Sequence, residues 1–211
     1  MSQDRLPPPE REACLVRLRP SSQKGGTIIA EDVTDRATHD RRICNPDEYR
    51  PPFCPNCGET TLHVHDYRER TMRAEPGEPV TRVVRHECVG CAAIWQILPV
   101  FIARHLWRTW RVVERTLTGA STSETSRWPR VPERTRRRWS ARWLGSSRFL
   151  GQILSGCGEA AWIRVAGMLT PEATCADLAV AYGEAWTTPA GQLLATVAAL
   201  VYRLQPNVRL M

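Results

Sequence analysis

The chain has no apolar run long enough to cross a bilayer, because a spanning helix needs about 20 consecutive apolar residues. Its best run, from Leu193 to Tyr202, covers ten positions and includes a threonine. The N-terminal sequence MSQDRLPPPE has no apolar segment of the kind that a signal peptide contains. These absences predict a soluble protein of the cytoplasm with no membrane partner.

Common catalytic and phosphate-binding motifs are also absent. None of the patterns G-x-x-x-x-G-K-[S/T], G-x-G-x-x-G, H-E-x-x-H or G-x-S-x-G occurs in the sequence. We therefore expect a protein that binds a partner without catalysing a reaction.

Composition points to a polyanionic partner. Among 211 residues, 29 Lys and Arg outnumber 22 Asp and Glu, which gives a net charge of +7 and a pI near 9.3. The apolar fraction of 42% is enough for one moderate domain or two small ones. Nucleic acid is the first partner to consider for such a basic chain.

Four of the eight cysteines form two C-x-x-C pairs, Cys54 with Cys57 and Cys88 with Cys91. In a reducing compartment this spacing is typical of zinc ligands, and four thiolates complete a closed, structural site. The residues between the pairs alternate as two strands around Pro76-Gly77, so a hairpin would bring the pairs together. His63, His65 and His86 could instead contribute to a metal site, although polar strand positions are the simpler interpretation.

The sequence divides into four regions. Residues 1–45 mix prolines and charges and predict a mostly flexible arm, with a possible short strand at 26–30. Residues 46–100 form the predicted zinc ribbon, 101–147 a helix-turn-helix unit and 148–211 a helical C-terminal region. The fold class is therefore α+β, with a small antiparallel zinc ribbon followed by helices.

A basic helix beginning near Pro132 is the predicted recognition helix. The first helix of the unit spans 106–118 and ends at Gly119, and Ser121-Thr-Ser-Glu124 has the form of a capping box for a short second helix. On the third helix Trp139 and Trp143 mark a packed face, and the opposite face and its borders carry arginines suited to phosphates and guanine edges. The candidate DNA-binding residues are Arg134, Arg136, Arg137, Arg138 and Arg142.

The stretches RPPFCPNCG, HVHDYRER, VTRVVRHECVGCAAIWQILPVFIARH, RVVERTLTG and VPERTRRRWSARW resemble one known group. The chain is similar over about residues 49–145 to the zinc-ribbon and helix-turn-helix region of bacterial insertion-sequence transposases. Within that group it most resembles transposon-associated stand-alone proteins of unknown function. The resemblance implies structural Zn²⁺ on the four cysteines and binding of double-stranded DNA through Arg134, Arg137 and Arg138.

The remaining residues do not suit a transposase active site. Only Glu159, Glu172, Asp177 and Glu184 follow the basic helix, whereas the nuclease domain of such enzymes needs three carboxylates for two metal ions. We therefore expect a nucleoid-associated DNA binder without a nuclease domain. A separate transposase catalytic subunit is a further candidate partner. Transcription control, RNA binding and a degenerate transposase subunit remain the alternatives.

The last helices offer a route to self-association. They are expected to begin near Pro171 and Pro189, and the final one has a wide apolar face that includes Leu193, Val197 and Leu204. A homodimer would cover that face and present two recognition helices. Completion of a monomer core is the equally weighted alternative.

Overall fold

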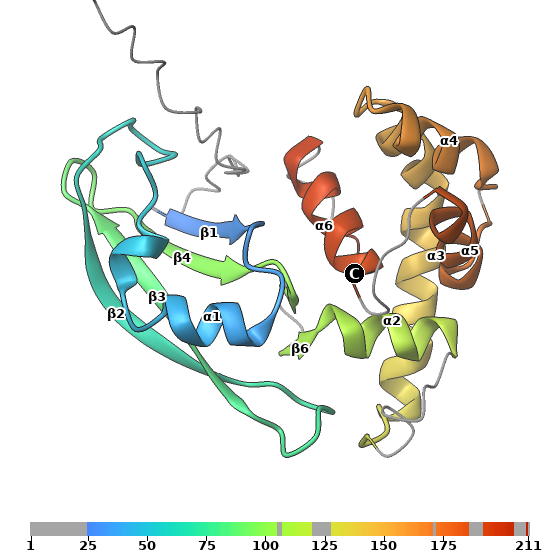
Figure 1. Ribbon diagram of the computed structural model, residues 1–211, viewed down its shortest axis with the longest axis horizontal. Coiled ribbons are helices and arrows are strands. Elements are labelled where there is room, and N and C mark those ends of the chain that lie inside the picture. The colour runs from blue at the N-terminus through green and yellow to red at the C-terminus, as the bar shows by residue number, and fades with distance from the viewer. Residues whose placement is uncertain are drawn as a thin grey trace, which may run out of the picture.

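The computed structural model describes residues 25–104, 107–119, 128–170, 172–185, 192–204 and 210. The sheet and α1 lie at one side of the molecule, and the later helices gather at the other (Figure 1). No described helix is both long and apolar enough to cross a membrane. In chain order the elements are β1 (Gly25–Ala30), α1 (Arg36–Arg42), the 3₁₀ helix η1 (Pro46–Tyr49), β2 (Leu62–Thr71), β3 (Val80–Cys88), β4 (Ile94–Pro99), β5 (Ile102–Ala103), β6 (Arg108–Thr109), α2 (Trp110–Thr118), α3 (Glu133–Ser155), α4 (Ala160–Met168), α5 (Cys175–Ala185) and α6 (Leu193–Leu204).

The main sheet is mixed rather than antiparallel. Its strand order is β1-β4-β3-β2. Strand β3 pairs antiparallel with both β2 and β4, and β1 pairs in parallel with β4 from Gly25 opposite Ile94 to Ala30 opposite Pro99. The expected antiparallel ribbon is therefore extended by one strand. A parallel neighbour needs a long crossover, and here α1, β2 and β3 supply it, so local sequence patterns do not reveal the pairing.

Part of the segment expected to be a flexible arm is built into the fold. The possible strand at 26–30 is present as β1, and α1 follows it. His39 of α1 is buried, with Nδ1 2.6 Å from the Tyr49 hydroxyl and Nε2 2.8 Å from the carbonyl of Arg82. These bonds tie α1 to η1 and to the sheet, and residues 1–24 lie outside the described residues.

Helix α2 ends as predicted but begins at Trp110 rather than at 106, because residues 108–109 pair with β5 as β6. Helix α3 is longer than expected. Gly119 caps α2 with a left-handed backbone (φ +70°), and its N–H donates to the carbonyl of Arg115 at 3.1 Å. The capping box at 121–124 and the short helix predicted after it lie outside the described residues, so the three-helix unit is not seen as a whole. Helix α3 passes position 147 because Ser147, Leu150 and Leu154 continue its buried stripe.

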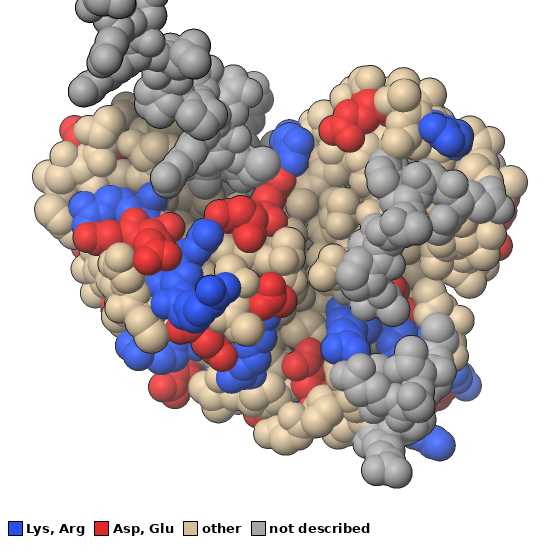
Figure 2. All heavy atoms as spheres, in the orientation of Figure 1, with Lys and Arg blue, Asp and Glu red and all other residues tan. Residues whose placement is uncertain are grey.

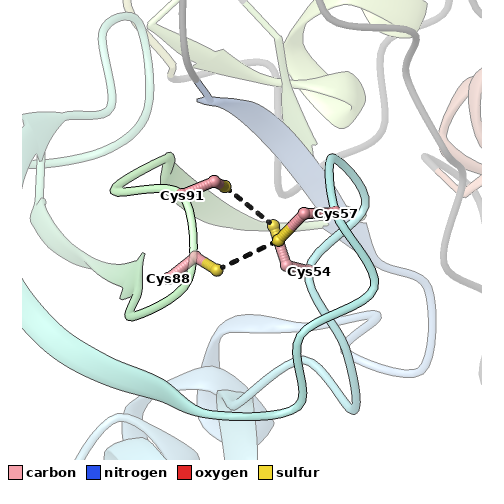
Figure 3. A group of neighbouring side chains, drawn as sticks. All are labelled: Cys54, Cys57, Cys88 and Cys91. Atoms are coloured by element: carbon pink, nitrogen blue, oxygen red, sulfur yellow. Dashed lines mark hydrogen bonds between the residues drawn. The ribbon is translucent and has the colours of Figure 1, made fainter.

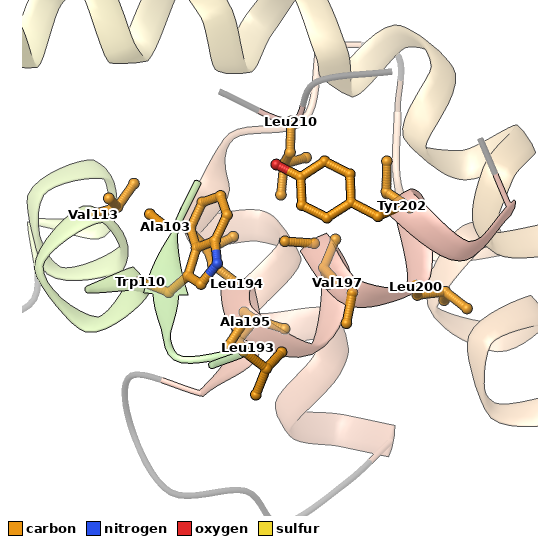
Figure 4. Packing of buried hydrophobic residues seen from close by; sticks show 14 of the residues in the cluster. Ala103, Trp110, Val113, Leu193, Leu194, Ala195, Val197, Leu200, Tyr202 and Leu210 are labelled. Atoms are coloured by element: carbon orange, nitrogen blue, oxygen red, sulfur yellow. The ribbon is translucent and has the colours of Figure 1, made fainter. Parts of the chain in front are cut away.

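Helix α6 lies inside the molecule. Its residues Leu193, Val197 and Leu200 pack in one cluster with Trp110 of α2 and with Leu210 (Figure 4). The same cluster also contains residues of β1, β3 and β4, so the sheet and the helices share a core. The apolar face expected to be available for a homodimer is therefore covered within the chain, as the monomer-core alternative supposed.

Candidate metal centre and basic surface

Two tight turns with the same hydrogen-bond pattern carry the four cysteines. In the first turn the N–H of Gly58 donates to the carbonyl of Cys54 at 2.9 Å, and in the second the N–H of Ala92 donates to that of Cys88, also at 2.9 Å. The N–H of each first cysteine donates to the carbonyl five residues later, at 2.7 and 3.0 Å. The hairpin of β2 and β3 brings the turns together, as predicted.

The four sulfur atoms have the spacing of a tetrahedral metal site. The Sγ atoms of Cys54 and Cys91 are 3.7 Å apart, those of Cys57 and Cys88 are 3.5 Å apart, and all four lie within 4.8 Å of one another (Figure 3). A zinc–sulfur bond of about 2.3 Å gives tetrahedron edges of about 3.8 Å. The four cysteines therefore fit one four-coordinate ion.

Two side chains donate hydrogen bonds to the sulfurs. Trp95 Nε1–H donates to the buried Sγ of Cys54 at 3.3 Å, and the amide of Asn56 donates to Sγ of Cys91 at 3.4 Å. The Asn56 bond lowers the pKa of Cys91 to about 6. Donors of this kind favour the thiolate form that a metal requires. Sequence analysis missed both residues, although Asn56 lies inside the first C-x-x-C pair, where its reach to a sulfur could have been considered.

The three histidines of this region do not join the cysteines. His86 is fully buried on β3, opposite Val64 and Trp95, and its pKa falls to about 4 because of burial and then the charge of Arg50. His65 places Nδ1 2.9 Å from a carboxylate oxygen of Glu87. Among the described residues, the four cysteines are the one group of potential ligands close enough to hold a metal ion.

The predicted arginines lie on the first three turns of α3. All five are exposed: Arg134, Arg136, Arg137, Arg138 and Arg142. The same helix buries Trp139 and Trp143, and the Trp143 indole donates to the carbonyl of Ala173 at 2.9 Å. This packing fixes which face of α3 is turned outward.

Glu133 engages two of these arginines. Its carboxylate oxygens lie 2.6 Å from Arg136 and 2.9 Å from Arg137, and the bond from Arg137 holds the pKa of Glu133 below its usual value. In the described part of the chain, Arg134, Arg138 and Arg142 make no ion pair. They are the arginines most available to an external anion.

The basic surface, made by the exposed arginines of α3 together with Arg73 and Arg108, extends from α3 to the hairpin of β2 and β3. Burial lowers the pKa of Arg108, and the positive charges of Arg73 and Arg138 lower it further, so each of these two arginines lies close enough to Arg108 to act on its charge. The guanidinium carbon of Arg108 is 5.2 Å from the Trp139 ring centroid. Arg side chains are visible over α2 and at the edge where α3 begins (Figure 2). Sequence analysis missed Arg73 and Arg108 because they are distant from α3 in the chain.

The comparisons with known proteins describe part of this arrangement. Residues 54–139 match the model of a domain of unknown function (DUF6431). The matched segment begins at the first cysteine of the metal site and ends within the basic turns of α3. The comparisons with curated proteins and with solved structures gave no match.

Proposed function

We propose that this chain is a zinc-containing protein that binds double-stranded DNA through the exposed face of α3. The observation that carries the proposal is the pairing, on one helix, of a buried tryptophan stripe with an exposed arginine face. Because the chain resembles the zinc-ribbon and helix-turn-helix region of insertion-sequence transposases, we assign its role to insertion elements and its location to the nucleoid.

The metal centre would act by stabilising the fold. When bound, Zn²⁺ would join the two cysteine turns and supply folding free energy to a small sheet. Four thiolates leave no open coordination position for a substrate. The centre therefore supports a structural role, in which the ribbon positions the basic hairpin beside α3.

The outward face of α3 suits a DNA groove. At about 100° per residue, Arg134, Arg137 and Arg148 lie about 140–180° from Trp139. Small residues, Ala141 and Gly145, separate these arginines, and no heavy atom lies within 4 Å of where a Gly145 Cβ would be. A helix with small residues between its cations can approach the floor of the major groove while guanidinium groups reach phosphates.

Binding without catalysis is the second part of the proposal. Of the acids considered as possible catalytic residues, Asp177 has a structural role, since it accepts hydrogen bonds from the N–H and the hydroxyl of Thr174 at 2.7 Å. The N–H of Asp177 in turn contacts the Thr174 hydroxyl at 3.2 Å, which completes a capping box for α5. The side chain of Glu184 lies outside the described residues.

RNA binding is the alternative function, and the exposure of the aromatic residues on α3 helps to judge it. Single-stranded RNA is held mainly by stacking on exposed rings, whereas Trp139 and Trp143 are buried. A duplex partner therefore fits α3 better. Competition of a DNA duplex against a structured RNA of equal charge tests this choice.

The decisive variant is Arg134→Ala with Arg138→Ala. Its matched control is Arg41→Ala with Arg164→Ala, which removes the same charge from exposed positions on α1 and α4. The α3 variant should weaken duplex binding and reduce the salt slope by up to about two units, about 0.9 per lost phosphate contact. The control should change both much less. Equal effects of the two variants, with folding intact, would refute a specific role for α3.

A further inference from the structure

A second feature of the basic surface is a pocket beside the ribbon hairpin. It has a volume of about 320 Å³ and lies between residues of the sheet on one side and Arg104 and Trp107 on the other. Its lining combines an apolar floor of Met72, Leu98 and Ile102 with the cationic and aromatic groups Arg70, Arg104 and Trp107. Two arginines and no carboxylate line it, so an anion is the ligand its charge favours.

Trp107 is held in the pocket wall in an unusual way. Its side chain is 45% exposed, although it is among the largest apolar groups of the chain. Its backbone has φ +55°, in the left-handed region that a bulky residue rarely adopts, and its carbonyl accepts from the N–H of Arg73 at 2.9 Å. Strained backbone that presents an exposed ring is more common at binding sites than in scaffold.

Arg70 places a positive charge over one face of that ring. Its guanidinium carbon lies 4.1 Å from the Trp107 ring centroid, and Nη2 donates to Oε1 of Gln96 at 3.2 Å. Partial burial and the neighbouring cations Arg68 and Arg85 lower its pKa. The contacts with Trp107 and Gln96 fix the position of the Arg70 guanidinium, and the surrounding positive charges favour an anion beside it.

We infer that this pocket binds one phosphorylated nucleoside unit, with its base against the face of Trp107 that Arg70 leaves open and its phosphate at Arg70 and Arg104. A ring with a cation beside it is the arrangement that holds unpaired nucleotides, because every base has a face for stacking and every nucleotide a phosphate. The volume accommodates a base, and the apolar floor excludes water from one side of it.

The pocket adjoins the surface proposed for duplex DNA. Arg73 bonds to Trp107 and lies near Arg108, which in turn lies near Arg138 of α3. A strand leaving a duplex on α3 would meet positive charge along this path. The nucleotide has two possible sources. One is the unpaired end of such a duplex, and this source rests on the proposed function. The other is a free nucleoside monophosphate.

The test uses the full zinc-loaded chain and three probes: a blunt duplex, the same duplex with a three-nucleotide single-stranded overhang that carries 2-aminopurine, and AMP. The overhang should tighten binding by about tenfold and quench the 2-aminopurine fluorescence, as stacking of one base predicts. Trp107→Gly removes the ring and suits the positive φ, so the variant should fold. It should abolish the overhang preference and leave blunt-duplex affinity unchanged.

Each outcome has one meaning. Equal binding of blunt and overhang duplexes, with no binding of AMP, overturns the inference, as does an overhang preference that survives Trp107→Gly. AMP binding that Trp107→Gly abolishes supports the pocket even if neither duplex binds, whereas the proposed function alone fails if the blunt duplex does not bind.

Discussion

Gly58 and Ala92 occupy equivalent positions in the two cysteine turns. Each lies four residues after the first cysteine of its pair, each donates its N–H to that cysteine at 2.9 Å, and each has a left-handed backbone, with φ +81° and +54°. Glycine adopts this conformation readily, whereas alanine is strained by its Cβ. The second turn is therefore the more strained of the two.

Exchanging these residues should change stability in opposite directions. Ala92→Gly relieves strain but increases the entropy of the unfolded chain, with a net gain of about 0.5 kcal/mol. Gly58→Ala should lower the free energy of unfolding by about 1 kcal/mol. Urea unfolding of the zinc-loaded variants measures both changes. If both substitutions raised the free energy of unfolding, or both lowered it, the positions of Gly58 and Ala92 would not be equivalent.

The pairing of β1 with β4 depends on Gly25. A Cβ at this position would lie 2.0 Å from the carbonyl oxygen of Ile94, which is backbone and cannot rotate away. Gly25→Ala should therefore destabilise the protein by at least about 2 kcal/mol. Gly77→Ala is the control, because Gly77 also has positive φ (+70°) but open space around it. Thermal unfolding measures both losses of stability. If they were similar, the backbone would have moved to relieve the clash at Gly25, and the pairing would not depend on that glycine.

The sequence predicted those parts of the fold that depend on neighbours in the chain. The C-x-x-C pairs and the hairpin between them are local patterns, and the cap at Gly119 is another. The parallel pairing of β1 was not predicted, because its partner β4 is more than 60 residues away. The exposed, strained Trp107 and the approach of Arg73 to α3 also depend on tertiary packing, so the pocket and the full basic surface could be found only in the structure.

His39 should make stability depend on pH. Its Nε2 faces the carbonyl of Arg82, which can only accept, so Nε2 carries the proton and Nδ1 accepts from the Tyr49 hydroxyl. Burial lowers the pKa of His39 below 6.5. Because the unfolded chain then binds the proton more tightly, stability present above pH 6.5 is lost as the pH falls through the folded pKa.

Ring resonances in an NMR titration measure this directly. Both rings should titrate below pH 6.5, and His86, whose pKa burial lowers to about 4, should titrate near that pH. Titration of His39 at or above pH 6.5 would contradict the buried, neutral state.

Glu133 should restrain DNA binding. Its carboxylate engages Arg136 and Arg137, so Glu133→Gln would release both guanidinium groups and remove a negative charge from the interface. Duplex affinity at low salt should rise about threefold, while helix stability falls by about 0.5 kcal/mol through loss of an acid at the helix N-terminus. Glu159→Gln, at the start of α4, makes the same charge change away from the interface. If it raised affinity equally in a fluorescence anisotropy titration, net charge alone would explain the effect.

The most direct test of the account is the metal content and ligand shell of the purified chain. Elemental analysis should give one zinc per chain, and X-ray absorption should give four sulfur neighbours at about 2.3 Å. Changing Cys54 and Cys88 together to Ser should remove the zinc and the cooperative unfolding of the sheet. A chain that folds without metal, or a shell containing nitrogen from a histidine, would contradict the assignment of Cys54, Cys57, Cys88 and Cys91 as a complete structural zinc site.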